Sequence, residues 1–183
     1  MSYECLKGDG RRRGLLSDWE KWLRQADKLY SRFLTRTEES PFCYHEIASV
    51  GFLASAAAIA GYLPFAEYDI VKRSKYDRAA NVNGRADLWF DADPRCYSFE
   101  FKRAWLAASI ENLTDVMQEA CEDIDCIHCD EYNYAAGGLI ARVRDVSRMS
   151  VYRNFAETDK VDLAYRIGPN GENGAFLFFK LVA

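Results

Sequence analysis

Two runs of alternating apolar and polar residues near the middle of the chain predict a pair of β-strands. They cover residues 84–90 and 96–103, and side chains two positions apart in each run share one face. In the second run aromatic residues occupy one face, while the other face carries Ser98, Glu100 and Lys102. Residues 91–95, DADPR, contain two Asp residues and a Pro, which favour a turn. The pattern therefore predicts a β-hairpin over residues 84–105.

Apolar residues spaced three and four positions apart predict helices on both sides of this hairpin. Trp19 and Trp22 lie on the apolar stripe of the first helix, where core packing explains them better than base stacking. Ser17 is a suitable N-cap for that helix. The expected helices cover residues 15–36, 44–62, 104–129 and 147–157, and further strands are expected over residues 64–74, 133–144, 161–167 and 175–182.

Segments that contain glycine mark the expected connections. Residues 81–84, NVNG, are expected to turn into the hairpin, and residues 168–174, GPNGENG, to connect the last two strands. Gly137 and Gly138 lie within an expected strand, where they indicate a bulge or a close approach of two backbones. Residues 1–14 are polar and partly basic, and we expect them to form a mobile arm.

The order of these elements predicts the class of fold. A chain of 183 residues is long enough for one domain with a substantial core. Strands flanked by helices indicate a single α/β (or α+β) domain, with a central mixed β-sheet covered by helices. After a core over residues 44–140, residues 141–183 are expected to add a helix and a hairpin.

Composition narrows the setting in which the protein works. The net charge is −4, so the chain does not coat nucleic acid through bulk positive charge, and any such contact must be local. No apolar run is long enough to span a membrane, and the N-terminus does not resemble a signal peptide. The sequence therefore favours a cytoplasmic protein without membrane contact, in which the six cysteines are reduced thiols.

Three charged residues of the predicted hairpin are the strongest candidates for chemistry. Glu100 and Lys102 lie on a strand built for burial, and a half-buried charge is costly unless it is paired or functional. An antiparallel hairpin would bring Asp87 close to Glu100, and a divalent cation with oxygen ligands would relieve their repulsion. Lys102 could then orient or deprotonate a water molecule, or stabilise charge on a phosphate. The alternative is a surface strand that carries a simple Glu–Lys ion pair.

Asp87 followed by Glu100-Phe101-Lys102 resembles the D…(D/E)-x-K signature of the PD-(D/E)xK nuclease superfamily, although Ala86 replaces its usual proline. The resemblance implies a restriction-endonuclease-like core and hydrolysis of phosphodiester bonds with Mg²⁺ or Mn²⁺. It also implies that Asp87, Glu100 and the Phe101 carbonyl hold the metal ion.

The helix before the core strands supplies a further acidic ligand in many members of this superfamily, and Glu46 resembles that residue. Glu46 would equally favour a helix N-terminus through the helix dipole. Its neighbour His45 is expected to be a capping or surface residue rather than a metal ligand.

Candidate contacts to nucleic acid lie before and after the hairpin. A basic run precedes Asp87, and although such runs are usually only solvated, this one would border the metal site. Gln118 resembles a glutamine of some related exonucleases, but the tyrosine expected four positions later is replaced by Glu122. The basic candidates are Lys72, Arg73, Lys75, Arg78 and Arg85.

A second cluster consists of Cys121, Cys126, His128 and Cys129. Cys126 and Cys129 have a spacing common in zinc sites, but no second pair at a usual spacing completes four ligands. The cluster is best explained as a group of reduced cysteines. A zinc-stabilised regulatory domain is the alternative.

The sequence thus predicts a metal-dependent nuclease that acts on nucleic acid, with DNA as the expected substrate. A single domain of this size that cuts both strands would usually act as a homodimer. The alternative is a non-catalytic binding or interaction module with the same core, in a phage, toxin–immunity or restriction context. The acidic total charge favours the module, whereas the complete Asp-Glu-Lys set favours the nuclease.

Overall fold

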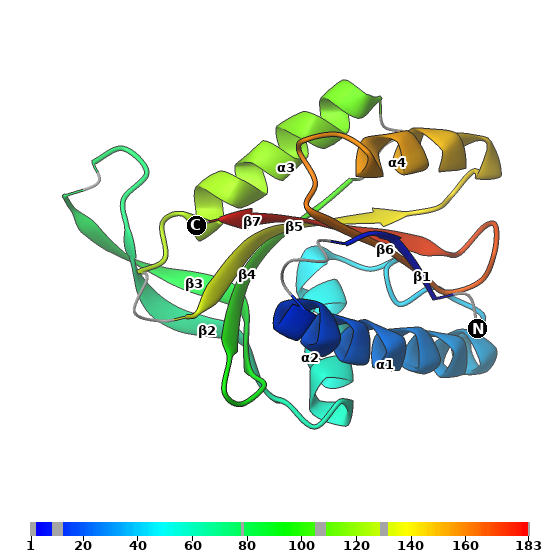
Figure 1. The fold of residues 1–183 in the computed structure, drawn as a ribbon, viewed down its shortest axis with the longest axis horizontal. Coiled ribbons are helices and arrows are strands. Elements are labelled where there is room, and N and C mark those ends of the chain that lie inside the picture. Colours follow the sequence, from blue (N-terminus) through cyan, green and yellow to red (C-terminus); the bar gives the residue numbers. More distant parts are fainter. Residues whose placement is uncertain (1–2, 9–12, 78, 105–108, 129–131, 183) are drawn as a thin grey trace.

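The computed structural model describes residues 3–8, 13–77, 79–104, 109–128 and 132–182. These residues form a seven-stranded sheet in the order β1-β6-β7-β5-β4-β3-β2 (Figure 1). Neighbouring strands are antiparallel except for β4 and β5, which are parallel, so the predicted mixed sheet is confirmed. The strands are β1 (Glu4–Lys7), β2 (Leu63–Arg73), β3 (Asn81–Asp91), β4 (Cys96–Arg103), β5 (Tyr134–Arg142), β6 (Leu163–Ile167) and β7 (Ala175–Val182).

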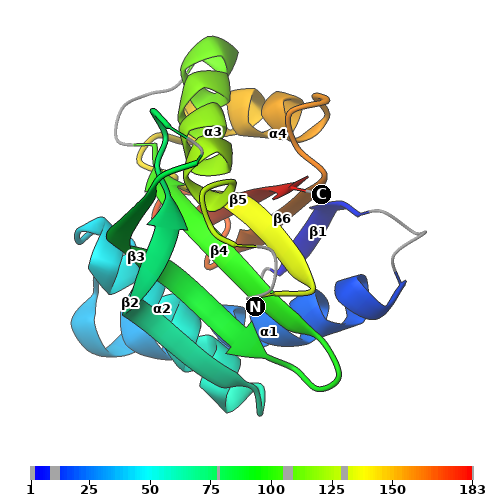
Figure 2. The same ribbon diagram turned by 90° about the vertical axis from the view of Figure 1, so that its left-hand side faces the viewer.

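Helices cover both faces of this sheet. α1 (Arg13–Thr37) and α2 (Glu46–Ile59) lie on one face, and α3 (Ile110–Ile124) and α4 (Met149–Ala156) lie on the other (Figure 1). A short 3₁₀ helix, η2 (Val146–Arg148), precedes α4. The view in Figure 2, from the β2 edge, places α2 and α3 on opposite sides of β2 and β3. The predicted single α/β domain is therefore confirmed.

The face covered by α1 and α2 holds the largest apolar core. Trp19 and Trp22 are 1% and 0% exposed, which confirms the predicted core role, and both pack against the aromatic face of β4. The indole N–H of Trp22 donates to the Leu53 carbonyl oxygen at 2.9 Å, which joins α1 to α2. Burying two indoles removes a large apolar area from water, and this helix pair therefore supports the hairpin from beneath.

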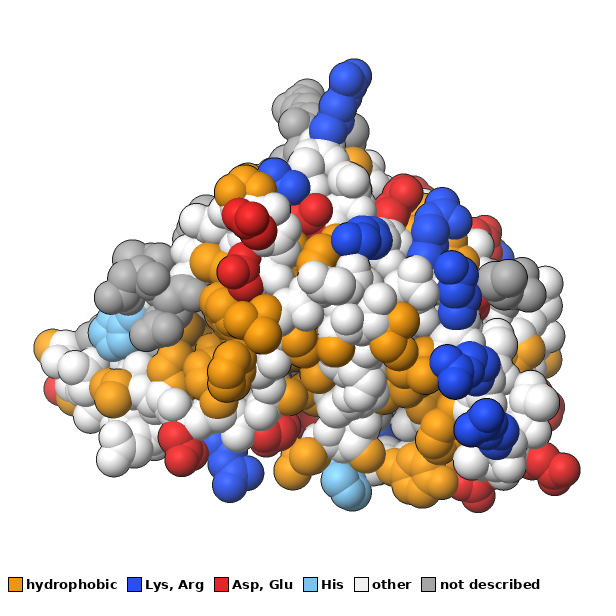
Figure 3. Space-filling model, turned by 90° about the horizontal axis from the view of Figure 1, so that it is seen from below, with side chains coloured by type: hydrophobic (Ala, Val, Ile, Leu, Met, Phe, Trp, Pro, Cys, Tyr) orange, Lys and Arg blue, Asp and Glu red, His pale blue; other side chains and the backbone are white. Residues whose placement is uncertain are grey.

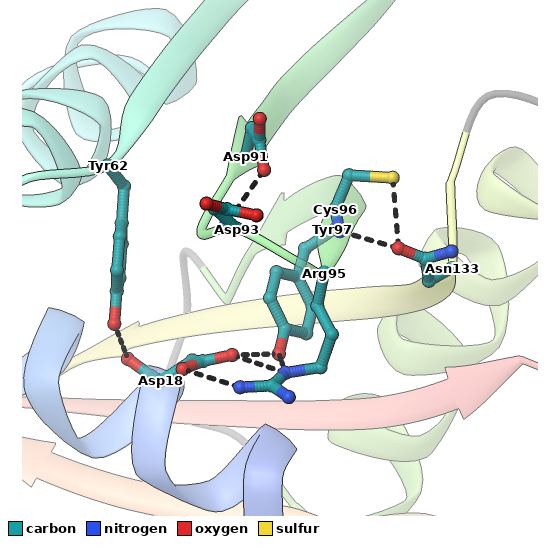
Figure 4. Close-up of polar contacts among 8 residues, drawn as sticks. All are labelled: Asp18, Tyr62, Asp91, Asp93, Arg95, Cys96, Tyr97 and Asn133. Atoms are coloured by element: carbon teal, nitrogen blue, oxygen red, sulfur yellow. Dashed lines mark hydrogen bonds and ion pairs between the residues drawn. The ribbon is translucent and has the colours of Figure 1, made fainter.

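A polar cluster centred on Asp18 fastens α1 to the tip of the β3–β4 hairpin (Figure 4). The Arg95 guanidinium binds both carboxylate oxygens of Asp18, at 2.7 Å and 3.1 Å. The Tyr97 hydroxyl donates to the same carboxylate at 2.5 Å, and the Tyr62 hydroxyl donates to the Asp18 backbone oxygen. These bonds fix the orientation of the hairpin relative to α1.

The two adjacent glycines of β5 permit close packing on both faces of the sheet. A Cβ atom on Gly138 would lie 2.4 Å from the Phe101 ring, and one on Gly137 would lie 2.8 Å from the Cys121 backbone nitrogen on α3. Both distances are far below van der Waals contact, so the predicted close approach is confirmed. α3 also provides the crossover that the parallel pair β4 and β5 requires.

Two segments that were expected to lie outside the sheet are strands in the structure. Residues 4–7 of the expected arm form β1, which pairs with β6, and the Lys7 ammonium donates to the Thr158 carbonyl oxygen at 2.7 Å. Residues 81–84 begin β3 rather than forming a turn, because they continue the ladder with residues 70–73. The connection between β2 and β3 therefore lies at residues 74–80.

Two helix boundaries also differ. α1 already begins at Arg13, so Ser17 lies inside the helix and is not its N-cap. α3 begins at Ile110, where the Ser109 side chain accepts the Asn112 N–H, whereas we expected the helix from residue 104. Parts of the predicted extensions, residues 105–108 and 129, lie outside the described residues. Within the described part of the chain, no helix is both long and apolar enough to cross a membrane.

Candidate active site

Asp87 lies where β3 and β4 begin to separate. Their register runs from Asp91↔Cys96 to Leu88↔Phe99, and the next residue of β3 is Asp87. Its carboxylate Oδ2 accepts the backbone N–H of Phe101 at 2.6 Å. The Asp87 side chain thus replaces a backbone acceptor at the end of the ladder and is held against the segment that contains Glu100.

Glu100 is buried, at 4% exposure, and lies within electrostatic reach of Asp87. Burial and the negative charge of Asp87 raise the pKa of Glu100 to about 7, although the ammonium of Lys72 acts in the opposite direction. The Lys72 Nζ lies 2.6 Å from the Glu100 Oε1. The structure therefore brings together the two carboxylates that the sequence paired, and adds a lysine from β2.

Lys102 forms an ion pair with Asp123 of α3, with 2.6 Å between Nζ and Oδ2. Burial disfavours its charged form, but the hydrogen bond and the negative charge of Asp123 outweigh this effect and raise the pKa of Lys102. Lys102 is therefore an ammonium group at neutral pH. Glu100 is buried and pairs with Lys72 rather than with Lys102, so β4 is not a surface strand that carries a Glu100–Lys102 pair.

Glu46 enters the same cluster from the first turn of α2. Burial is the largest cause that raises the pKa of Glu46. The positive charge of Lys102 lowers this pKa, and the negative charge of Asp87 raises it. His45 is the N-cap of α2, and its Nδ1 accepts the Ala48 N–H at 3.3 Å, which confirms the capping role. Glu46 thus lies at a helix N-terminus and beside the hairpin carboxylate at the same time.

Two acidic residues of this cluster were not singled out in the sequence. Glu67 lies in β2 with a φ of 53°, and burial together with the charge of Asp87 raises its pKa. Short-range sequence patterns do not predict a left-handed residue inside a strand. Asp123 could have been noticed, because an acidic residue between the apolar helix positions Ala120 and Ile124 is expected to lie near the core.

Three residues of the predicted DNA-contact run, Lys72, Arg73 and Lys75, are used for internal contacts instead, and the partner of Lys72 is the buried Glu100. The Arg73 guanidinium donates to the carbonyl oxygens of Asp125 and Ile127, at 2.9 Å and 3.2 Å. Lys75 forms an ion pair with Asp123, the partner of Lys102. These contacts attach the end of β2 to the C-terminal end of α3, so the basic run serves in part to close the fold.

Arg85 remains the most accessible described member of that run, because its side chain is 63% exposed. Its guanidinium lies 3.8 Å from the carboxylates of both Glu67 and Asp69, which are weak contacts at this distance. Arg78 lies outside the described residues.

Gln118 and the cysteines of α3 lie outside this cluster of charged residues. The Gln118 amide donates to Glu122 at 2.9 Å on the exposed face of α3. Cys121 and Cys126 are free thiols, and the Cys126 thiol donates to the Glu122 carbonyl oxygen. Cys129 lies outside the described residues.

The donor chemistry around Asp87 suits a hard divalent cation. Among the described residues, no group of three or more Asp, Glu, His or Cys side chains is arranged to hold a metal ion. Mg²⁺, however, is commonly held by one or two carboxylates, with water and substrate phosphate as further ligands. Burial raises the pKa values of Asp87 and Glu100, and the negative charge of Asp87 raises that of Glu100 further, so a nearby cation would favour the charged form of both groups. The pair therefore fits Mg²⁺ or Mn²⁺ in ligand type and charge.

A further surface feature lies along α1. Its exposed face carries five cations at helical spacing, and Figure 3 shows Lys and Arg side chains in a row on this side of the molecule. Beside it lies an apolar groove of about 440 Å³ between α1 and α2, lined in part by Leu29, Phe33 and Phe52. The pattern is visible in the sequence, on the side of the helix opposite the apolar stripe. The five cations are Lys21, Arg24, Lys28, Arg32 and Arg36.

Comparison with known proteins identifies no relative of this chain. No protein-family model matches the chain, and neither a curated protein nor a solved structure matches it.

Proposed function

We propose that this protein is a metal-dependent nuclease of the PD-(D/E)xK type that hydrolyses phosphodiester bonds in nucleic acid. The observation that carries the proposal is the cluster of Asp87, Glu100 and Lys102 on two adjacent strands. Glu46 joins them from a helix at the edge of the same cluster. A buried strand has no packing reason to carry these charges together.

The order of elements gives independent support by analogy of fold. α2 is followed by the antiparallel strands β2, β3 and β4, then by α3 and by β5, which is parallel to β4. This is the order of helix, three strands, helix and strand that the resemblance implies for the superfamily core. Analogy of fold alone does not establish an activity, so the proposal rests mainly on the charged cluster.

Asp87 and Glu100 would hold Mg²⁺ or Mn²⁺, with Glu46 and the Phe101 carbonyl as further ligands by the same resemblance. When bound, the metal ion would lower the pKa of a water molecule and compensate negative charge on the phosphate. Lys102 is an ammonium group, which suits stabilisation of negative charge on the reacting phosphate better than removal of a proton. Asp123 acts as a positioning residue, because its ion pair fixes the direction of the Lys102 side chain.

DNA is the proposed substrate, and Arg85 is the described cation of the basic run with the most exposed side chain for a phosphate contact. Cleavage of both strands would require two copies of this single-site domain, which favours a homodimer. The free thiols of Cys121 and Cys126 suit a reducing compartment, and we place the protein in the cytoplasm.

A second candidate function is a non-catalytic interaction module. Two observations favour it: the described residues contain no ready-made set of three metal ligands, and the row of exposed cations on α1, beside an apolar groove, suits a partner that is both acidic and apolar. The two functions differ in whether the chain binds Mn²⁺ and cuts nucleic acid.

The deciding experiment is cleavage of linear, circular and single-stranded DNA and of RNA with Mg²⁺ or Mn²⁺. Glu100→Ala and Lys102→Ala are compared with Lys160→Ala, a control on an exposed lysine outside the cluster. Cleavage that both site variants abolish and the control retains would support the nuclease. Absence of cleavage, together with absence of Mn²⁺ binding in calorimetry, would contradict it and favour the module. Cleavage that survives both site variants would indicate a contaminant or a different site.

A further inference from the structure

The ion pair between Lys72 and Glu100 is an unusual contact for two charged residues of one sheet. The ammonium and the carboxylate oxygen are 2.6 Å apart, and the two side chains are only 14% and 5% exposed. Lys72 belongs to β2 and Glu100 to β4, so the lysine side chain reaches past the whole of β3. A buried ion pair of this kind contributes little net stability compared with apolar packing, which suggests a role other than stability.

Gly84 of β3 provides the path for this contact. A Cβ atom at Gly84 would lie 3.2 Å from Cδ and 3.7 Å from Cε of Lys72. The lysine stem therefore runs over the one position of β3 where no side chain obstructs it. The geometry directs the Lys72 ammonium to the carboxylate that the proposed function assigns to the metal ion.

The other two lysines of the cluster are held elsewhere. Lys75 and Lys102 both form ion pairs with Asp123 on α3. Lys72 is thus the lysine paired with Glu100, and its positive charge also acts on Asp87, after the larger effect of Lys102. The Lys72 ammonium therefore occupies the position beside Glu100 where a divalent cation would supply charge of the same sign.

We propose that Lys72 is a built-in counter-ion of the metal site, which a divalent cation displaces from Glu100 and which then becomes available to bind a substrate phosphate. This inference rests on the proposed nuclease function and deepens it. Lys72 and the metal ion compete for one carboxylate, so the metal affinity of the resting protein is reduced. A phosphate that binds the released ammonium relieves the competition, and metal and substrate therefore bind cooperatively.

The test is the affinity for Mn²⁺ without substrate, measured by calorimetry and by electron paramagnetic resonance. Lys72→Met removes the competing charge and should tighten Mn²⁺ binding roughly tenfold, within the usual range for coupled sites. Lys72→Arg keeps the charge and should bind like the wild type. Lys75→Met removes a neighbouring lysine whose partner is Asp123, and it should also bind like the wild type.

Equal Mn²⁺ affinity of the wild type and Lys72→Met would overturn this inference and leave the nuclease proposal intact. Absence of Mn²⁺ binding by both proteins would overturn both. Should Lys72→Met fail to fold, the ¹⁵N signal of the Lys72 ammonium in the wild type, assigned with Lys72→Arg, decides the question. Addition of Mg²⁺ should shift that signal while the Lys7 signal stays in place. An unchanged Lys72 signal at Mg²⁺ concentrations that saturate the protein would overturn the inference.

Discussion

The carboxylate of Asp87 accepts the backbone N–H of Phe101 at 2.6 Å, and this bond joins β3 to β4 where their ladder ends. Asp87 therefore has a structural role as a hydrogen-bond acceptor and a proposed role as a charged ligand. The two roles are separable, because asparagine keeps an acceptor oxygen and loses the charge.

Asp87→Asn should keep the fold and lose Mn²⁺ binding and cleavage. Asp87→Ala should also lose about 1–3 kcal/mol of the free energy of unfolding, because the N–H of buried Phe101 is left without an acceptor. Urea unfolding and calorimetry measure the two effects separately. Equal destabilisation by Asn and Ala would contradict the structural role assigned to the carboxylate.

Four carboxyl groups around the hairpin share one direction of pKa shift, and this predicts how stability depends on pH. The pKa values of Glu46, Glu67, Asp87 and Glu100 are all raised, with burial as the largest cause and that of Glu100 reaching about 7. Between the ordinary carboxyl pKa and about 7, the folded state holds protons that the unfolded state has released. The free energy of unfolding should therefore fall as pH rises through this window in metal-free buffer.

For Glu100 this loss should be on the order of 1–3 kcal/mol, and Glu100→Gln should show a flatter dependence above pH 4.5. Burial acts to raise the pKa of Asp123, but its two lysine partners outweigh this effect and lower it. Its contribution to the free energy of unfolding is therefore lost only as pH falls below the ordinary Asp pKa, outside this window. Denaturant unfolding from pH 4.5 to 8 measures the slope. A wild type whose stability rises across this window would contradict the assignment.

The Asp18 cluster predicts a large effect far from the proposed chemistry (Figure 4). Asp18→Ala leaves Arg95 and Tyr97 without their shared partner and should cost about 3 kcal/mol. Arg24→Ala, on the same helix, removes a long contact to Glu20 and a cation–π contact with Tyr3, and it should cost about 1 kcal/mol or less. Thermal and urea unfolding compare the two variants, and similar costs would rule out a special role for the cluster.

Gly138→Ala tests the close packing of β5 against β4. The added methyl group would overlap the Phe101 ring and should destabilise the protein by about 1–3 kcal/mol. Gly51→Ala is the matched control, because no atom lies within 4 Å of its added Cβ and it occupies a helix. That variant should gain about 0.5–1 kcal/mol through helix propensity. A tolerated Gly138→Ala would mean that Phe101 can move aside.

Local patterns were sufficient to predict several features of this protein. The two faces of β4 follow from the two-residue period of a strand, and this placed Phe101 in the core and Glu100 and Lys102 on the opposite face. The burial of Trp19 and Trp22 follows from helical spacing in the same way. Both periods depend on backbone geometry within a few residues, which the sequence records directly.

The sequence by itself thus determined the hairpin, the faces of its strands and the candidate carboxylates, because each depends on short-range periodicity. Tertiary structure alone decided that Lys72 pairs with Glu100 and that Asp123 pairs with Lys102. These contacts join residues 28 and 21 positions apart. The first depends on the register of three strands and on the path over Gly84, and the second on how α3 packs against β4. Short-range patterns carry no information on such distances, so the charge partners became visible only when the sheet was assembled.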